Sequence, residues 1–130
     1  MFNGFQTFRL ADVLRIQSPA PHAAFVQQAL ALRGEHRPVN PTVDLSTIEH
    51  LLLSASSQFG VIAVHSEVAD PGVCFIGAVE RVAQGRVTLR TINRDARWDD
   101  ERETISLAGI TRVDFGGLYE SALLLVNSAG

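Results

Sequence analysis

The stretch "TISLAGITRVDFGG", Thr104–Gly117, repeats in outline near the start of the chain, where Thr7–Gln17 reads "TFRLADVLRIQ". Four identical residues keep the same spacing: Thr7 and Thr104, Leu10 and Leu107, Ala11 and Ala108, Arg15 and Arg112. Apolar positions coincide as well: Phe8, Val13 and Ile16 with Ile105, Ile110 and Val113. The second copy follows enough chain to complete a small module, whereas only a few residues precede the first. We therefore expect residues 1–42 to form an incomplete first module and residues 43–130 a complete one.

The complete module has the pattern of a small β-domain. Short runs of β-branched and aromatic residues alternate with turn sequences, which predicts five strands. Gly77 interrupts the second strand, which indicates a sharp bend or a close approach of two backbones. The predicted strands are Gly60–Glu67, Val73–Ala83, Arg86–Asn93, Arg102–Leu107 and Ile110–Phe115, with a charged loop at Arg94–Glu101.

Helices are expected on both sides of these strands. "STIE", Ser46–Glu49, has the capping-box pattern and opens a helix that runs through Ser56. Its apolar face comprises Leu45, Ile48, Leu52 and Ala55, widened by Leu51 and Leu53. "LYESALLLV" predicts a short helix ending near Val126, although "LLLV" also fits a strand. A helix followed by five tightly connected strands predicts a mainly β fold, a five-stranded small barrel of the Sm-like order within the SH3-like class, because closure removes exposed strand edges.

The N-terminal unit is shorter. Two strands are predicted at Gly4–Leu10 and Val13–Gln17, followed by a helix that Ser18 caps and Gly34 ends. Pro19 or Pro21 suits the first turn of this helix. Phe25, Val26, Ala29 and Leu30 give it one apolar face. The Pro- and Gly-containing stretch Gly34–Val43 reads as the linker to the second module.

The composition is that of an ordinary globular protein, with 46% hydrophobic residues, 19% charged residues and a net charge of −3. No apolar run is long enough to span a bilayer, and the opening residues do not form a signal peptide. The single cysteine, Cys74, excludes an internal disulfide and fits the cytoplasm. All eleven basic residues are arginine, the side chain best suited to paired contacts with phosphate or carboxylate groups.

Four runs resemble a group of uncharacterised bacterial proteins with an Sm-like barrel: "VDLSTIEHLL", "VCFIGAVERV", "VTLRTINRDARWDDERETISL" and "ITRVDFGGLYESALLL". The resemblance covers Val43 to Val126. It implies tandem modules, of which the first ends in a strand pair and helix like Gly4–Arg33, and it implies no established activity. The RNA-binding loops of Sm and Lsm proteins do not carry over, because the corresponding positions here read Gln84–Gly85 and Leu107–Gly109.

Several side chains suggest an interaction surface. Trp98 lies between charged residues, where it either packs back on the barrel or presents an apolar anchor to a partner. Arg86, Arg90 and Arg94 share strand parity and are predicted to line one face. The predicted surface comprises Trp98, Arg86, Arg90, Arg94 and Arg97.

Catalytic chemistry has no recognisable motif, and we predict no catalytic, cofactor-binding or metal-binding residues. The four histidines, His22, His36, His50 and His65, are never three or four residues apart, although His50 and His65 could meet. The acidic residues Asp95, Asp99, Asp100, Glu101 and Glu103 are interleaved with arginines and are predicted to form a solvated loop. Cys74 is predicted to be buried and inert, and Asp114 to pair with Arg112 on one strand face.

Three functions remain open from the sequence. The first is a non-catalytic assembly or protein-interaction module, in which the unpaired N-terminal strands dock on this chain or on a partner, with a homo-oligomer as the expected state. The second is an RNA or single-stranded nucleic-acid binder, which the net charge does not favour. The third and weakest is a metal-assisted hydrolase that uses the acidic loop. No membrane partner is predicted.

Overall fold

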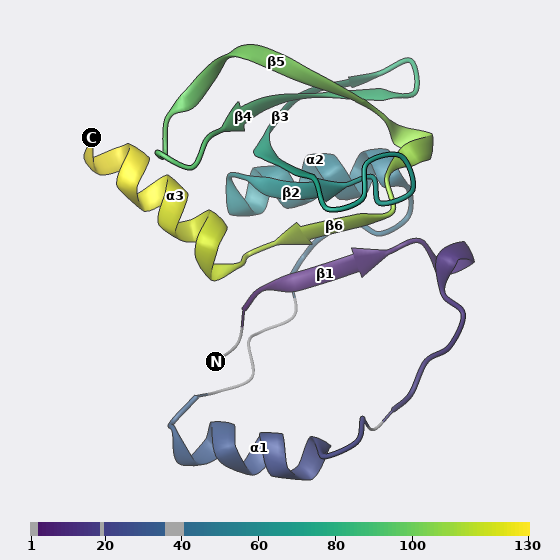
Figure 1. The fold of residues 1–130 in the computed structure, drawn as a ribbon, viewed down its shortest axis with the longest axis vertical. Helices are drawn as coiled ribbons and strands as arrows, with labels where there is room; N and C mark the ends of the chain where they lie inside the picture. The colour runs from purple at the N-terminus through teal and green to yellow at the C-terminus, as the bar shows by residue number, and fades with distance from the viewer. Residues whose placement is uncertain (1–2, 19, 36–40) are drawn as a thin grey trace.

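The computed structural model describes residues 3–18, 20–35 and 41–130 of the chain. Six strands form one antiparallel sheet in the order β1-β6-β2-β3-β4-β5, with three helices (Figure 1). The strands are β1 Phe5–Phe8, β2 Ile62–His65, β3 Cys74–Ala83, β4 Arg86–Ile92, β5 Trp98–Ser106 and β6 Arg112–Phe115. The helices are α1 Ala23–Leu32, α2 Ile48–Phe59 and α3 Leu118–Ala129, and two 3₁₀ turns, η1 Leu10–Asp12 and η2 Leu107–Gly109, each follow a strand.

The β-rich class with flanking helices is confirmed, but the sheet is open rather than closed into a ring of strands. β1 and β5 are its two edges among the described residues. The sheet is nevertheless strongly curved, because Ile105 of β5 and Phe115 of β6 belong to one buried cluster. Helix α2 contributes Leu51, Leu52 and Ala55 to that cluster.

The predicted strands need four corrections. Val13–Gln17 is not a strand, although its residues alternate suitably, because no strand of the described chain pairs with it. The charged loop is shorter than expected, since β5 begins at Trp98 and pairs with β4 through Ile92↔Trp98. The last predicted strand begins later, at Arg112, because Leu107–Gly109 forms a 3₁₀ turn in place of a two-residue turn. The first strand is confined to Phe5–Phe8.

The helices also differ from their predicted ends. α3 is helical through Ala129, which excludes a strand at "LLLV". α1 begins at Ala23 after His22 and has no side-chain cap, so Ser18 does not cap it. Pro19 and residues 36–40 of the predicted linker lie outside the described residues, whereas Gly34 follows the end of α1 with a φ of +74°.

The N-cap of α2 is Thr47 rather than Ser46. The Thr47 hydroxyl accepts a hydrogen bond from the backbone N–H of His50 at 3.1 Å. The Ser46 hydroxyl instead donates to Asp44 at 2.6 Å and lies 3.0 Å from Nδ1 of His50. The helix continues three residues beyond Ser56 and ends at Gly60, whose φ of +87° favours glycine.

The shifted cap predicts a difference between two neighbouring substitutions. Thr47→Ala removes the side chain that satisfies a free N–H of the first turn, so it should lower the free energy of unfolding by about 1 kcal/mol. Ser46→Ala removes only exposed side-chain contacts and should cost about 0.5 kcal/mol or less. Urea denaturation of both variants measures the difference. A larger loss for Ser46→Ala would mean that Ser46 is the true cap.

Gly77 marks a close approach of two backbones, as predicted. A Cβ atom placed on Gly77 would lie 2.5 Å from the carbonyl oxygen of Arg90 on the neighbouring strand β4. The bulge in β3 lies farther along, between Val79 and Arg81. The turn between β3 and β4 is Gln84–Gly85, and both residues have positive φ, as a tight hairpin turn requires.

Candidate interaction site

Strand β1 lies on the outer edge of β6, so the N-terminal strand docks on a later strand of the same chain. The register is Phe5↔Phe115, Gln6↔Asp114, Thr7↔Val113 and Phe8↔Arg112. Thr7 donates its hydroxyl hydrogen to the carbonyl oxygen of Val113 at 2.8 Å. The guanidinium of Arg9 donates to the carbonyl oxygen of Ala108, also at 2.8 Å. These contacts hold the C-terminal half of β1 and the residue before η1 against the second copy of the repeated phrase.

An aromatic cluster fixes the beginning of β1. The ring of Phe5 stacks on the buried Phe115 with a centroid distance of 5.6 Å, and Phe59 of α2 lies 5.1 Å from Phe115. The backbone N–H of Leu118 donates to the side-chain oxygen of Asn3, which joins the same end of β1 to the start of α3. β1 is therefore held by side-chain packing as well as by its ladder.

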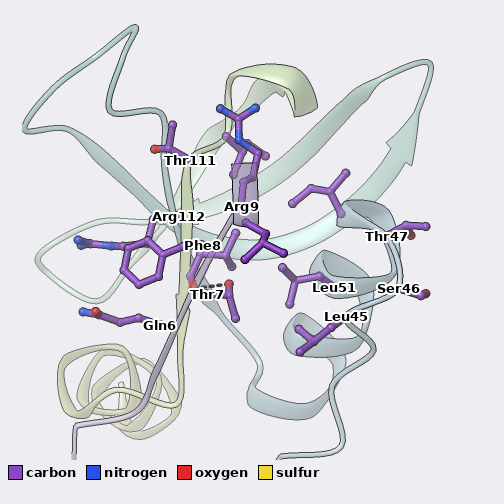
Figure 2. A pocket seen from close by; sticks show the side chains of 14 residues that line it. Gln6, Thr7, Phe8, Arg9, Leu45, Ser46, Thr47, Leu51, Thr111 and Arg112 are labelled. Atoms are coloured by element: carbon purple, nitrogen blue, oxygen red, sulfur yellow. Dashed lines mark hydrogen bonds between the residues drawn. The ribbon is translucent and has the colours of Figure 1, made fainter. Parts of the chain in front are cut away.

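A groove of about 490 Å³ lies between β1 and the first turns of α2 (Figure 2). Figure 2 shows Thr7 on the side of β1 that faces Leu51, while Gln6 and Phe8 lie on the other side with Arg112. The apolar residues that line it are Phe8, Leu10, Leu45, Ile48, Leu51, Ile110 and Val113. Because β1 forms one wall, the groove exists only while β1 is paired with β6.

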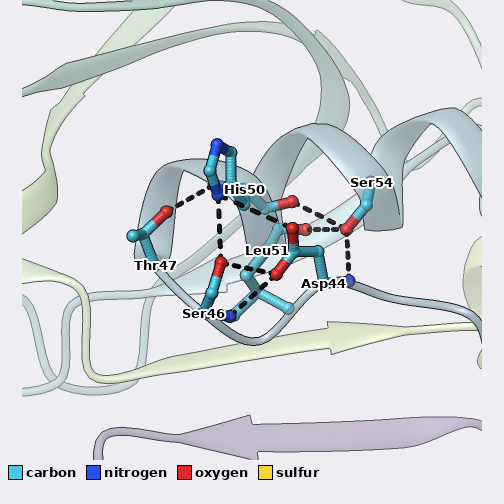
Figure 3. A network of polar contacts seen from close by, with 6 residues as sticks. All are labelled: Asp44, Ser46, Thr47, His50, Leu51 and Ser54. Atoms are coloured by element: carbon cyan, nitrogen blue, oxygen red, sulfur yellow. Dashed lines mark hydrogen bonds and ion pairs between the residues drawn. The ribbon is translucent and has the colours of Figure 1, made fainter.

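The rim of this groove at α2 carries a polar network (Figure 3). Asp44 accepts hydrogen bonds from the hydroxyl and the backbone N–H of Ser46, which lower the pKa of its carboxyl group. Its other carboxylate oxygen lies 3.6 Å from Nδ1 of His50, and Ser54 donates its hydroxyl hydrogen to the carbonyl oxygen of His50. The network is exposed, and its bonds hold the residues before α2 against the helix.

A second polar cluster lies on the face of β6 opposite to the buried Val113. Arg112 Nε lies 3.1 Å from Asp114 Oδ1, which confirms the predicted pair. His65 of β2 joins them, with its Nε2 3.4 Å from Asp114 Oδ2 and 3.1 Å from an Arg112 nitrogen. Sequence reasoning missed His65 here because its position opposite Arg112 follows from the β2·β6 register. His50 lies in the other network, so the two histidines do not share a site.

Cys74 is exposed, which contradicts the prediction of a buried thiol. Its position opposite His65 at the start of β3 places it at the end of the sheet, away from the core. Partial burial of the thiol, followed by the carboxylates of Asp114 and Glu120, raises its pKa. The thiolate is therefore disfavoured, and Cys74 has the character of a weak nucleophile.

The residues predicted to form an interaction surface are spread over β4, β5 and the turn between them. The half-buried Trp98 packs on a cluster of Val61, Ile92, Ala96 and Leu123, and the guanidinium carbon of Arg90 lies 4.5 Å from its ring centroid. Of the two alternatives for Trp98, its contacts are therefore those of a side chain that packs back on the protein. Arg86 and Arg90 lie exposed on β4. The strand ends at Ile92, so Arg94 and the exposed Arg97 lie beyond it, and strand alternation does not place them on the same face.

The predicted acidic loop does not gather its carboxylates. Asp99 accepts hydrogen bonds from Thr91 and Asn93, and Arg102 pairs with Glu80 at 2.7 Å. In residues 3–18, 20–35 and 41–130, no three His, Cys, Asp or Glu side chains come together as a metal site would require. His36 lies outside these ranges.

The repeated phrase is also a repeated structure. Adding 97 to each residue number converts η1 into η2, and it places the end of α1 at Leu32 on the end of α3 at Ala129. The residues before the two 3₁₀ turns, Arg9 and Ser106, have the same φ of −67° and ψ values of 129° and 128°. We call residues 5–32 the first repeat and residues 102–129 the second repeat.

The first repeat leaves most of its apolar residues exposed. No residue of α1 is buried, and Figure 1 shows α1 apart from the sheet. α3, its counterpart, buries Leu123 against the sheet. The exposed large apolar residues that follow β1 are Leu10, Leu14, Ile16, Phe25, Val26 and Leu32.

Comparisons with known proteins identify no relatives. No protein-family model, no curated protein and no solved structure matches this chain. None of its described helices is long and apolar enough to cross a bilayer.

Proposed function

We propose that this chain is a non-catalytic assembly module that binds its partner by adding a strand to a sheet edge. The observation that carries the proposal is the state of the first repeat. Its strand is docked on β6, whereas residues 13–18 pair with no strand of the described chain and expose Leu14 by 99% and Ile16 by 73%. Exposed apolar residues in one contiguous segment are typical of a protein-interaction surface.

The free edge of β5 supports the same proposal. A strand at the edge of a sheet presents unpaired N–H and C=O groups that another strand can bind. Proteins often protect such edges, but β5 is nine residues long and is not covered by another strand of the described chain. Addition of an extended segment to an exposed edge is a recurring mode of recognition.

The Sm-like barrel remains part of this proposal. In its favour, α2 precedes five strands in chain order, and the first of them, β2, lies between the second, β3, and the last, β6. The curvature of the sheet around one core also fits a small barrel. The open β5 edge and the docked β1 would then be the two surfaces through which such modules join.

Assembly predicts a mass above that of the monomer. Light scattering on the full chain at about 100 μM should give a mass of at least twice 14.1 kDa. Ile16→Ser should lower the average mass because it removes an exposed apolar contact from the free segment. Leu125→Ser is the matched control, since Leu125 is 72% exposed on α3 and should leave the mass unchanged. A monomer at this concentration would contradict the proposal.

Nucleic-acid binding is a second candidate, supported by the two exposed arginines on one face of β4, Arg86 and Arg90. Single-stranded RNA titrated at low salt should bind, and its affinity should fall steeply as salt increases. Arg86→Gln should weaken this binding, whereas Arg33→Gln, at the end of α1, should not. Absence of binding at low salt would exclude this function.

A further inference from the structure

The two repeats make one strand pair within the chain and leave the reciprocal pair unmade. β1, from the first repeat, pairs with β6, from the second. The reciprocal pair would join β5 of the second repeat to residues 15–18 of the first. Among the described residues, no strand pairs with residues 15–18, and β5 has a free edge.

We propose that residues 15–18 of one copy pair with Arg102–Ile105 of a second copy, in the register of β1·β6. This inference rests on the proposed assembly function and names its partner. In the β1·β6 register, we replace each residue of β1 by the residue 97 positions later and each residue of β6 by the residue 97 positions earlier. This gives the register between the two copies. The resulting pairs are Arg102↔Ser18, Glu103↔Gln17, Thr104↔Ile16 and Ile105↔Arg15.

Two of these four pairs have the same chemistry as the pairs that the structure contains. Thr7 lies opposite Val113, and Thr104 would lie opposite the β-branched Ile16. Cross-strand pairs of this kind are the units that stabilise a sheet. The pair Ile105↔Arg15 does not repeat Phe8↔Arg112, because Phe8 is exposed whereas Ile105 is buried in the core.

In the second matching pair, Glu103↔Gln17, the carboxylate and the amide change places between the two repeats. Gln6 of the first repeat lies opposite the carboxylate of Asp114 in the second. In the proposed pair, the carboxylate comes from Glu103 and the amide from Gln17. Arg15 is then a diagonal neighbour of Glu103, as Arg112 is of Gln6. No like charges lie opposite each other, so the charges favour this register. The fourth pair, Arg102↔Ser18, does not reproduce the stacking of Phe5 on Phe115.

A second copy is the occupant that the arrangement favours. β1 and β5 are opposite edges of the sheet, and the segment after η1 leaves on the β1 side toward α1 (Figure 1). Within the second repeat, β5 and β6 likewise do not pair with each other. Among the described strands, β1 therefore pairs with the other repeat, and the distant free edge of β5 is open to the first repeat of another chain.

The threonine hydroxyl adds a specific contact. In the pair that the structure contains, Thr7 donates to the carbonyl oxygen of Val113 at 2.8 Å. Thr104 is the matching threonine, and it is exposed on the free edge. Its hydroxyl would donate to the carbonyl oxygen of Ile16 of the second copy.

Disulfide trapping between two single-cysteine proteins tests the pairing. Thr104→Cys and Ile16→Cys are prepared separately in a Cys74→Ser background, with one of them carrying a mass tag, and are mixed under mild oxidation. Directly opposite residues have Cβ atoms about 4.5–5.5 Å apart, near the separation of about 3.5–4.5 Å that a disulfide requires. The expected result is a tagged–untagged dimer in at least tenfold excess over dimers of either protein alone.

Controls separate this pairing from its alternatives. Leu14→Cys mixed with Thr104→Cys shifts the contact by two residues and should give much less heterodimer. Disulfide dimers of Thr104→Cys alone would indicate a symmetric β5·β5 contact and overturn the proposal. The variant with both cysteines in one chain should form links between chains, and an internal disulfide would equally overturn it.

Light scattering on the same samples separates this inference from the proposed function. An oligomer that gives no heterodimer excess would overturn the pairing and leave the assembly function standing. A monomer that gives no disulfide at either position would contradict both. An oligomer with the heterodimer excess would support both.

Discussion

Phe115→Ala should lower the free energy of unfolding by about 3–5 kcal/mol, because it leaves a cavity where β6, β1 and α2 meet. Phe115 is 2% exposed and lies opposite Ile62 of β2 and Phe5 of β1. Its ring also contacts Phe59. The same substitution removes the stacking partner of Phe5, so it should loosen β1 together with the core.

Urea denaturation followed by circular dichroism measures this loss. With a slope of about 1–3 kcal/mol per molar urea, the midpoint should fall by at least about 1 M. Phe25→Ala is the matched control, because Phe25 is 71% exposed on α1, and it should change the stability by no more than about 0.5 kcal/mol. Equal losses for the two variants would contradict the described core.

Gly77→Ala should lower the free energy of unfolding by about 2–3 kcal/mol, because the added methyl group meets backbone rather than a movable side chain. The new Cβ would lie 2.5 Å from the carbonyl oxygen of Arg90 and 3.0 Å from the Cα of Thr91. β3 and β4 must separate to admit it, at the point where Gly77 also lies opposite Ile62 of β2.

Gly109→Ala serves as the control for this substitution. The nearest atom to a Cβ on Gly109 is the Ser66 hydroxyl oxygen at 4.0 Å, so this variant should stay within about 0.5 kcal/mol of the parent. Thermal unfolding of the three proteins under identical conditions gives the comparison. A Gly77→Ala protein as stable as the parent would show that β3 and β4 do not approach this closely.

Local patterns in the sequence predicted most of the elements, and tertiary pairing explains the errors. Val13–Gln17 alternates like a strand, but a strand requires a neighbour, and none is present in the described chain. Trp98–Glu101 reads as a charged loop, yet it begins β5 because β4 supplies a ladder for it. The repeated phrase marked two segments that share a conformation, but the sequence did not predict the 3₁₀ turns within them.

The candidate site could be predicted only in part. The pair of Arg112 and Asp114 follows from their spacing on one strand, but His65 joins them only through the β2·β6 register. Trp98 could not be assigned from its charged neighbours, because its packing partners come from distant segments such as Val61 and Leu123. The sequence left open whether the N-terminal strand docks on this chain or on a partner, because only the β1·β6 register identifies its neighbour.

Hydrogen exchange at two protein concentrations tests whether one strand pair forms within the chain and its reciprocal forms between chains. Amide protection is measured by mass spectrometry on peptides covering β1, residues 13–18 and Arg102–Ile105, at about 1 μM and about 200 μM. β1 is expected to be protected equally at both concentrations. Residues 15–18 and Arg102–Ile105 should gain protection together only at the higher one. Protection of β1 that rises with concentration, or free exchange of residues 15–18 at both concentrations, would contradict this arrangement.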